Sequence, residues 1–544
     1  MNESLDLIDK KKVKIVHPIL IAIFPILILY SQNMGEMSVE DLILPILLVV
    51  GFSVCLYYCL NRVIKNNNKS AIIVSILLII LFSYGHIYYL LSDISPEEFD
   101  IARNRYLIPL FTAILIAGTI FTIKTKRILN NATSVINVIS FVFIIVAISN
   151  VAIVTSEILN CNDCSNQEIF YEERDFSNYF EIHNFSVTEN QKLPNIYYLI
   201  LDEYAREDAL LEYHEYDNSE FLGYLESKGF HVAKNSFSNY AMSVSSIPSI
   251  MNMEYMNFLS KEIGTEVRNF KPLIGKDGLY SNNQVIKNFK EMGYKIITFN
   301  TFSLESEPNS LSDITTCHQS LYVLENKLVD ALSRTSIFGY FVERWSEAEI
   351  RQATLCGLDK FASIGNEIDE PIFVWSHVML PHPPWVFGAN GEEVTPGTPL
   401  LITDNPEFRE SGWEPRTQYI QQLQFANKKT IEIIEEILEK DSYSIIIIQG
   451  DHGTAWELNW KDPSREDVLQ RLRNLDAIYF PDEEKREVLD DDRTLVNTFR
   501  TIFNTYYGSN YEYLEDKMYW SFNAKPYYFT DVTKIIFEEN SNSQ

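Results

Sequence analysis

Two apolar runs in the sequence end in side chains that could bind a metal ion. The first is followed directly by Asp202 and Glu203, and a later one leads, through Gln-Gly, into Asp451 and His452. Carboxylate oxygens and imidazole nitrogens are ligands that Mg, Ca, Mn and Zn ions find in proteins. We therefore predict a site for one divalent metal ion of unassigned identity, with Asp202 or Glu203 as a ligand beside Asp451 and His452.

A hydroxyl-rich segment between these two clusters supplies a candidate nucleophile. Ser243 and Ser246 stand where the segment 239–253 becomes apolar at helical spacing. The N-terminus of a helix stabilises the negative charge of an incoming phosphate or sulfate group, and a nearby metal ion activates a serine hydroxyl. We predict that one of these serines attacks the substrate, with ordinary helix capping as the competing interpretation.

Two histidines follow a third apolar run. His382 lies among prolines, and its imidazole could orient a substrate oxygen or protonate a leaving group. His377 comes directly after the run, where either a buried structural histidine or a catalytic one fits the sequence. We include both histidines in the predicted site, and His382 is the better candidate of the two.

The elements that must position these residues are those of an α/β domain. After residue 193, short apolar runs alternate with amphipathic helices, which is typical of a mostly parallel sheet covered by helices on both faces. In such sheets ligands gather beyond the carboxyl ends of the strands, where all the candidate clusters lie. The expected strands are 196–201, 295–299, 371–375, 444–448 and 477–480, all predicted to be parallel, and the expected helices include 220–228, 345–361, 417–438 and 494–506.

The first 155 residues are a predicted α-helical membrane domain. Apolar runs without Asp, Glu, Lys or Arg, each of about the length that a bilayer requires, predict about five transmembrane helices, near 15–32, 42–60, 71–91, 106–123 and 135–154. Lysines and arginines flank alternate ends, which we place in the cytoplasm together with the N-terminus. We expect a multi-pass plasma (inner) membrane protein with a linker at 156–192, a catalytic domain at 193–530 on the extracytoplasmic side and a C-terminal tail at 531–544.

Charge and cysteine content restrict the partners and the compartment. The chain has a formal net charge of −29, and residues after 155 carry the acidic excess. Such a domain is a poor partner for nucleic acid or for an anionic lipid surface. Four cysteines fall in the region expected outside the membrane, where disulfides form. One possible pairing joins Cys161 to Cys164 and Cys317 to Cys356.

The order of these motifs resembles the alkaline phosphatase superfamily in its sulfatase-like branch, over roughly residues 193–528. Glu203-Tyr-Ala-Arg206 resembles the Glu-Thr-Ala-Arg of phosphoethanolamine transferases, and Ser243-x-x-Ser246-x-Pro248 is similar to their Thr-x-x-Ser-x-Pro. The Asp-His-Gly at 451–453 is similar to the motif of the same branch. Several spanning helices followed by an external catalytic domain also resemble phosphoethanolamine transferases and lipoteichoic acid synthases.

This resemblance implies a metal-dependent hydrolase or transferase that acts on phosphate esters of the cell envelope through a covalent intermediate on Ser243. Its expected partners are the lipid bilayer and an envelope lipid or polysaccharide substrate. The chain has no histidine after His452, whereas the transferases carry another one, so a single metal ion is expected.

Three alternatives remain at this point. A sulfatase acting on extracellular sulfated glycans would convert Ser246 to formylglycine, although Ile250 stands where the sulfatase motif has arginine. An inert sulfatase-fold scaffold in polysaccharide assembly would not need the metal ligands. A transporter is disfavoured because transport paths usually place ionisable groups inside the membrane.

Overall fold

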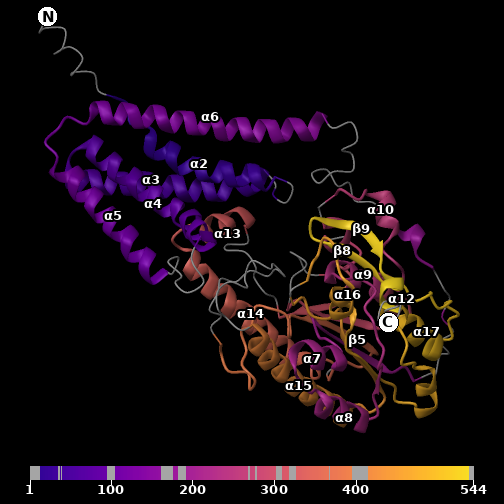
Figure 1. The fold of residues 1–544 in the computed structure, drawn as a ribbon. Helices are drawn as coiled ribbons and strands as arrows, with labels where there is room; N and C mark the ends of the chain where they lie inside the picture. The colour runs from indigo at the N-terminus through magenta and orange to yellow at the C-terminus, as the bar shows by residue number, and fades with distance from the viewer. Residues whose placement is uncertain are drawn as a thin grey trace, which may run out of the picture. The chain divides into compact units, whose positions relative to one another are not determined.

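A computed structural model describes most of the chain (Figure 1). The described residues are 13–34, 37, 39–94, 104–160, 176–181, 185, 192–267, 270–275, 278–301, 309–317, 326–366, 368–394, 415–456 and 458–537. They divide into two compact units, which we describe separately: residues 1–165 with 320–346, and residues 166–319 with 347–544.

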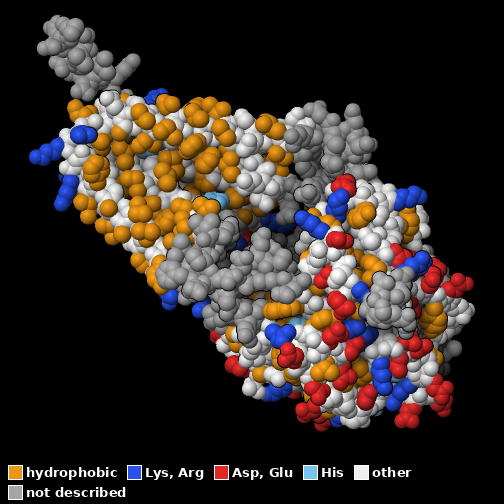
Figure 2. Space-filling view, in the orientation of Figure 1, with side chains coloured by type: hydrophobic (Ala, Val, Ile, Leu, Met, Phe, Trp, Pro, Cys, Tyr) orange, Lys and Arg blue, Asp and Glu red, His pale blue; other side chains and the backbone are white. Residues whose placement is uncertain are grey.

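Five apolar helices lie in the described part of residues 1–165 of the N-terminal unit. They are α2 (His17–Gln32), α3 (Ile43–Ile64), α4 (Asn67–Ile94), α5 (Asn104–Lys124) and α6 (Asn130–Asn160). Four of them are long and apolar enough to cross a membrane, whereas α2 has only 16 residues and is shorter than these four. Hydrophobic side chains cover much of the visible surface of this unit (Figure 2). An α-helix pairs its own backbone polar groups, so it can place such a surface against lipid.

The N-terminal unit also contains a segment from far along the chain. Helix α13 (Lys327–Arg334) follows the strand β4 in sequence, yet its Leu328 and Leu332 pack in one apolar cluster with Ile26, Leu29 and Tyr30 of α2. From the sequence we expected these residues in the catalytic domain at 193–530. The structure groups residues 320–346 with the membrane helices instead.

The second unit contains a seven-stranded sheet. Its strands are β1 (Asn195–Leu201), β2 (His231–Val232), β3 (Lys295–Phe299), β4 (Ile314–Thr316), β5 (Ile372–Val378), β6 (Ser444–Gly450) and β7 (Asp476–Tyr479), in the order β2-β7-β6-β1-β5-β3-β4. The five strands from β6 to β4 are parallel. The mostly parallel sheet is therefore confirmed, but the prediction that strand 477–480 is parallel is wrong, because β7 pairs antiparallel with β6.

Helices cover both faces of the sheet, as the alternation of side chains along β1 requires. Tyr197, Leu199 and Leu201 enter one core, which α14 (Gly339–Phe361) and α15 (Pro415–Lys440) help to form. Ile196 and Ile200 enter the other core, with residues from α9 (Ser243–Asn252), α12 (Gln284–Glu291) and α17 (Thr498–Tyr507). The remaining elements are α7 (Glu207–His214), α8 (Ser219–Ser227), α10 (Phe258–Glu262), α11 (Lys271–Ile274), α16 (Arg465–Leu472), α18 (Thr533–Phe537), the hairpin β8 (Tyr519–Phe522) and β9 (Lys525–Asp531), and the 3₁₀ turns η1 (Val39–Leu42), η3 (Ser177–Tyr179), η6 (Glu483–Val488) and η7 (Leu495–Asn497).

One of the two predicted disulfides is present. Cys317, after β4, is bonded to Cys356 of α14. Cys161 and Cys164 lie outside the described residues. Cys55 and Cys59 of α3 are free thiols.

Candidate active site

The sheet brings the predicted site residues to one edge. Leu201, the last residue of β1, is paired with Val378 of β5 on one side and with Gly450 of β6 on the other. The residues that follow these parallel strands therefore emerge together. Asp202 and Asp451 come directly after β1 and β6, so they lie next to each other as the strand ends predict.

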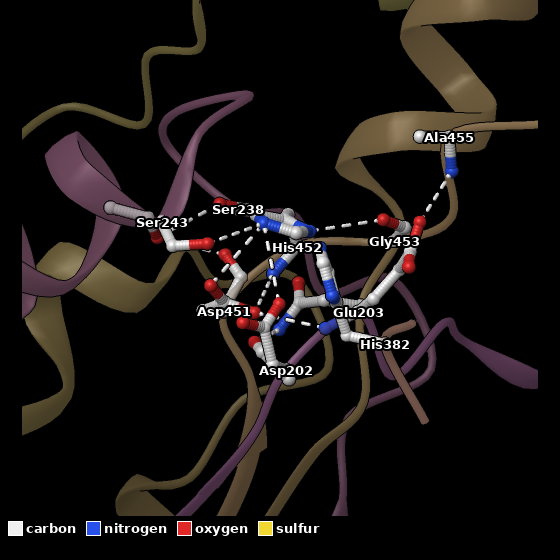
Figure 3. A network of polar contacts seen from close by, with 12 residues as sticks. Asp202, Glu203, Ser238, Ser243, His382, Asp451, His452, Gly453 and Ala455 are labelled. Carbon is white, nitrogen blue, oxygen red and sulfur yellow. Dashed lines mark hydrogen bonds and ion pairs between the residues drawn. The ribbon is translucent and has the colours of Figure 1, made fainter. Parts of the chain in front are cut away.

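Asp202, Asp451 and His452 form a buried group that could hold a metal ion, which we call the metal-ligand group (Figure 3). Each offers one ligand atom, and these atoms lie within 4.8 Å of one another. His452 Nε2 is 3.3 Å from Asp451 Oδ2 and 3.7 Å from Asp202 Oδ1. All three side chains are buried, and neither of those two carboxylate oxygens accepts a hydrogen bond from the described residues.

Such an arrangement fits a cation. A buried carboxylate oxygen without a donor is costly, and a divalent ion is the group that would compensate two of them at once. Two carboxylates and one imidazole also match the donors that such ions take. Asp202, Asp451 and His452 therefore have the chemistry of a metal site, and among the described residues they are the one group of this kind.

The backbone fixes which nitrogen of His452 faces the carboxylates. The ring Nδ1 lies 3.0 Å from the Gly453 carbonyl oxygen, so Nδ1 carries the proton and donates it there. The lone pair of Nε2 then points into the cluster, which is the form in which imidazole binds a metal ion. Gly453 itself must be glycine, since a Cβ atom there would lie 2.4 Å from the Gln470 carbonyl oxygen.

Ser243 is the first residue of α9, and its hydroxyl faces this cluster. The Oγ atom lies 2.9 Å from His452 Nε2. Ser243 is partly exposed, whereas all the other residues of α9 are buried, so substrate can reach this hydroxyl alone among those of the helix. The side chain is thus placed both beside the metal ligands and at a helix N-terminus, as the sequence analysis predicts for a nucleophile.

Ser246 has a different environment, although it lies less than one turn further along α9. Its hydroxyl is buried and donates to the Asp451 carbonyl oxygen at 2.8 Å. The Oγ atom also lies 3.1 Å from Ser238 Oγ. These contacts hold the main chain of the metal-ligand loop against α9 and leave the hydroxyl facing protein rather than the cluster.

The two candidate histidines both contact Asp202. His377 lies inside β5, and its Nε2 is 3.2 Å from Asp202 Oδ2. His382 lies in the loop after β5, where its backbone N–H donates to the Asp202 carbonyl oxygen at 3.2 Å. Burial alone raises the pKa of the Asp202 carboxyl, but the charge on His382, followed by the hydrogen bond and charge of His377, holds that pKa well below its ordinary value. Asp202 is therefore an anion at neutral pH.

Glu203 points away from the metal-ligand group. Its backbone adopts the left-handed conformation with φ 64°, and its Oε1 accepts from the Ala455 N–H at 2.8 Å and from Arg471 at 3.3 Å. The sequence left Asp202 and Glu203 as alternative ligands. This geometry favours Asp202 and gives Glu203 the task of holding the loop that follows His452.

Arg471, near the end of α16, is the residue of the site that the sequence did not reveal. Its guanidinium is buried and contacts the Glu203 carboxylate, the Gly453 carbonyl oxygen at 3.1 Å and His452 Nε2 at 3.1 Å. It also donates to the Ala241 carbonyl oxygen, two residues before Ser243. One cation thus connects the turn after β1, the metal-ligand loop and the approach to α9.

Comparisons with known proteins find similar solved structures but no closer relative. No family model and no curated protein matches the sequence. The C-terminal periplasmic domain of EcEptC from Escherichia coli in complex with Zn is 13% identical, with 65% of this chain and 97% of that chain covered and a TM-score of 0.42. The integral membrane lipooligosaccharide phosphoethanolamine transferase A (EptA) from Neisseria meningitidis is 12% identical over 90% of this chain and 94% of that one, with a TM-score of 0.37.

A hydrolase is among the similar structures as well. The phosphonate monoester hydrolase of Agrobacterium radiobacter is 11% identical over 60% of this chain and 80% of that chain, with a TM-score of 0.38. At these values the comparisons do not assign an activity to this chain, and a function has to be supported by the site itself.

Proposed function

We propose that this protein is a membrane-anchored, metal-dependent enzyme of the sulfatase-like branch of the alkaline phosphatase superfamily, which transfers or hydrolyses phosphate-ester groups of the cell envelope. The observation that carries the proposal is the position of Ser243. Its Oγ lies 2.9 Å from His452 Nε2, at the start of a helix and beside two buried carboxylates, each with one oxygen that accepts no hydrogen bond from the described residues.

The protein's own residues suit a two-step displacement. Ser243 Oγ loses its proton to solvent, attacks phosphorus and forms an oxygen–phosphorus bond, while the bond from phosphorus to the ester oxygen breaks and the leaving alcohol takes up a proton. His382, which lies beside Asp202, is placed to orient a phosphoryl oxygen or to supply that proton. Water or an envelope hydroxyl then attacks the seryl ester and restores Ser243.

Asp202, Asp451 and His452 would hold the metal ion. When bound there, a divalent cation lowers the pKa of the serine hydroxyl and neutralises charge on the phosphoryl oxygens. His377 and Arg471 support this ligand set from outside, because His377 contacts Asp202 and Arg471 donates to the Gly453 carbonyl oxygen of the loop that carries His452. Their contacts fix the orientation of Asp202 and His452 before substrate arrives.

The sulfatase alternative is disfavoured by the surroundings of Ser246. Formylglycine formation at this residue would remove the hydroxyl that donates to the Asp451 carbonyl oxygen. Ser246 is also buried, whereas Ser243 is partly exposed. Ser243, by contrast, needs no rearrangement to face the metal ligands.

The placement of the catalytic unit outside the membrane rests on two features. Basic residues flank the ends of the apolar helices that we assign to the cytoplasm, which leaves the chain after α6 on the opposite side. The Cys317–Cys356 disulfide fits an oxidising compartment. An enzyme held at the outer membrane surface would meet lipid-linked substrates of the envelope.

The test is to capture the intermediate on the full-length protein in lipid nanodiscs. The protein is loaded with Zn, Mn or Mg, incubated with p-nitrophenyl phosphate or its phosphodiester, quenched in acid and analysed by peptide mapping with bound metal quantified. We expect a phosphate-containing adduct on Ser243, none in Ser243→Ala, and retention of the adduct in Ser246→Ala.

Other results would contradict the proposal in defined ways. Formylglycine at Ser246, with turnover of p-nitrophenyl sulfate, would establish the sulfatase instead. A folded protein that binds none of these metals and forms no adduct would leave the inert scaffold as the better account.

A further inference from the structure

The segment 327–346 is placed unusually for part of an α/β domain. In sequence it lies between β4 and β5 of the sheet, yet α13 packs against the apolar helix α2 of the N-terminal unit (Figure 1). Leu328 and Leu332 face Ile26 and Leu29, and Asn326 caps α13 with its side-chain oxygen, which accepts from the Val329 N–H. The chain thus returns to the membrane helices after the sheet has begun.

Backbone hydrogen bonds connect this segment to the helix α4. The Gly85 N–H donates to the Thr335 carbonyl oxygen at 3.1 Å, and the Ile337 N–H donates to the Leu81 carbonyl oxygen at 3.1 Å. A Cβ atom on Gly85 would lie 2.4 Å from the Thr335 oxygen and 2.6 Å from its carbonyl carbon. Only glycine allows this approach, since a side chain there would collide with backbone that cannot rotate away.

The contact lies deep along a helix that could span the membrane. Lys69, near the start of α4, donates to the Ile123 and Thr125 carbonyl oxygens at the end that we assign to the cytoplasm. At a rise of about 1.5 Å per residue, Gly85 lies about 24 Å along α4 from Lys69. A hydrocarbon core is about 30 Å thick, so this contact falls near its outer boundary.

Two polar side chains of the segment, Arg334 and Thr335, are hydrogen-bonded within it. Arg334 donates to Asp330 at 2.7 Å and to Ser346 at 2.9 Å, so its charge is paired within the segment. The Thr335 hydroxyl donates to the Ala331 carbonyl oxygen at 2.9 Å. Internal pairing of this kind is what a low-dielectric surrounding demands.

Aromatic side chains lie next to this contact. Ile337 packs against Tyr84, Leu107 and Phe111 of α4 and α5, while Phe338 is 52% exposed and Phe341 is 65% exposed. In water, large apolar side chains exposed together beside an apolar helix bundle are unfavourable. At the boundary of a bilayer the same side chains are stabilised by contact with acyl chains and headgroups.

We propose that residues 327–346 form a membrane-embedded interfacial element, with Phe338 and Phe341 in the outer leaflet and Gly85 as its docking point on α4. The partner of this surface is the lipid bilayer, because the surface is continuous with helices that are themselves long and apolar enough to span it. The element gives the catalytic unit a second covalent connection to the membrane unit, independent of the chain that follows α6.

Spin labelling of the full-length protein in phosphatidylcholine nanodiscs tests the location. A nitroxide is attached to Phe338→Cys, or to Phe341→Cys in a second variant, after serine replaces Cys55, Cys59, Cys161 and Cys164. The matched control carries the label at Leu211→Cys of α7, which is 59% exposed. We expect the label at 338 to collide more with oxygen than with a water-soluble nickel complex, and the label at 211 to show the reverse.

Two results would overturn the location. A water-like ratio of oxygen to nickel collisions at both 338 and 341 would place the segment in solvent. A label that is immobile and shielded from both reagents would show that protein, from a partner or a second copy, covers this surface.

Two alanine variants test the role of Gly85 as the docking point. Gly85→Ala should move the label at 338 toward water-like accessibility, because the new Cβ displaces Thr335. Gly51→Ala of α3 should leave it unchanged, because no atom lies within 4 Å of a Cβ there. Equal behaviour of the two alanine variants would contradict the role of Gly85. The label at 338 with Gly85 intact still tests the location if Gly85→Ala fails to fold.

Discussion

Two regions of buried charge lie on either side of the turn formed by Asp202 and Glu203. On the metal-ligand side, Asp202 Oδ1 and Asp451 Oδ2 accept no hydrogen bond from the described residues. On the supporting side, the Glu203 carboxylate accepts from Ala455 and Arg471. The Glu203 carboxylate therefore faces hydrogen-bond donors, whereas Asp202 and Asp451 each keep one oxygen that accepts no hydrogen bond from the described residues.

This difference indicates that the residues on one side serve metal binding and those on the other side serve stability. A buried charge whose hydrogen bonds are complete stabilises the arrangement that contains it, and removing one partner is costly. A buried carboxylate oxygen without a hydrogen-bond donor is costly in the metal-free protein and is retained where a ligand will compensate it. Substitutions on the two sides should consequently change stability in opposite directions.

The largest effect is expected for Asp451→Asn on the metal-ligand side. Turnover should fall by at least about 10³-fold, since a ligand and charge at the reacting centre are lost. The metal-free variant should melt at a higher temperature than metal-free wild type, because one of two neighbouring buried anions is neutralised while Oδ1 still accepts from the Glu203 and His452 N–H groups.

Calorimetry or circular dichroism in detergent measures the melting temperature of each protein without metal and the increase in stability when metal is added. Metal at 100 times its Kd should stabilise wild type by about 2.7 kcal/mol and the variant by much less. A metal-free variant that is less stable than wild type would show that Asp451 is structural and would weaken the contrast between the two sides.

Arg471→Met on the supporting side should destabilise the protein by about 4 kcal/mol whether or not metal is present. Methionine fills much of the volume of the arginine stem, but Glu203 then remains buried without its cation. Urea unfolding of the metal-free protein measures the loss. The double variant Arg471→Met with Glu203→Gln is the control, and it should recover part of the stability because no unpaired charge remains.

The two sides also differ in how much of them the sequence could predict. Asp202, Asp451, His452 and Ser243 each follow directly from a strand end or a helix start, and strand ends of a parallel sheet meet at one edge. The local sequence pattern was therefore enough to predict that these side chains lie close together. The five apolar helices and the strands β1, β3, β5 and β6 were predicted for the same reason, since their periodicity is contained in their own residues.

Features that depend on contacts between distant segments were not predictable from pattern. Arg471 is one of several arginines around α16, and nothing local distinguishes it from Arg473, which binds Glu212 near the surface. β2 and β4, with two and three residues, are too short to show a period. The docking of Thr335 on Gly85 likewise depends on a backbone contact between two segments that no single window of sequence contains.

A pH-dependent loss of stability is expected from His214, a buried residue of α7 that lies close to the Glu203 turn. His214 Nε2 lies 3.2 Å from the Thr454 hydroxyl, and its ring stacks on Tyr419, whose hydroxyl donates to the Glu203 carbonyl oxygen. Burial, assisted by the charge of Arg416, lowers the pKa of His214 from 6.5 to about 4. The unfolded chain therefore binds a proton at a higher pH than the folded protein does.

The stabilising contribution of neutral His214 is present in full above pH 6.5 and is lost as the pH falls toward 4. Across that window the free energy of unfolding should fall by about 3 kcal/mol more in wild type than in His214→Gln. Urea titrations of both proteins at several pH values measure the difference. Parallel pH profiles would mean that His214 titrates normally in the folded state.

The smallest effect is expected for Ser246→Ala. This variant compares Ser246 with Ser243, which lies less than one turn away in the same helix. The variant leaves the buried Asp451 carbonyl oxygen without the hydroxyl that it accepts from, so the free energy of unfolding should fall by about 1 to 2 kcal/mol. The rate of the chemical step should change far less than in Ser243→Ala, because the Ser246 hydroxyl faces protein. Single-turnover kinetics and urea unfolding on the same preparations separate these two effects. If Ser246→Ala lost as much turnover as Ser243→Ala at unchanged stability, Ser246 would take part in the chemical step.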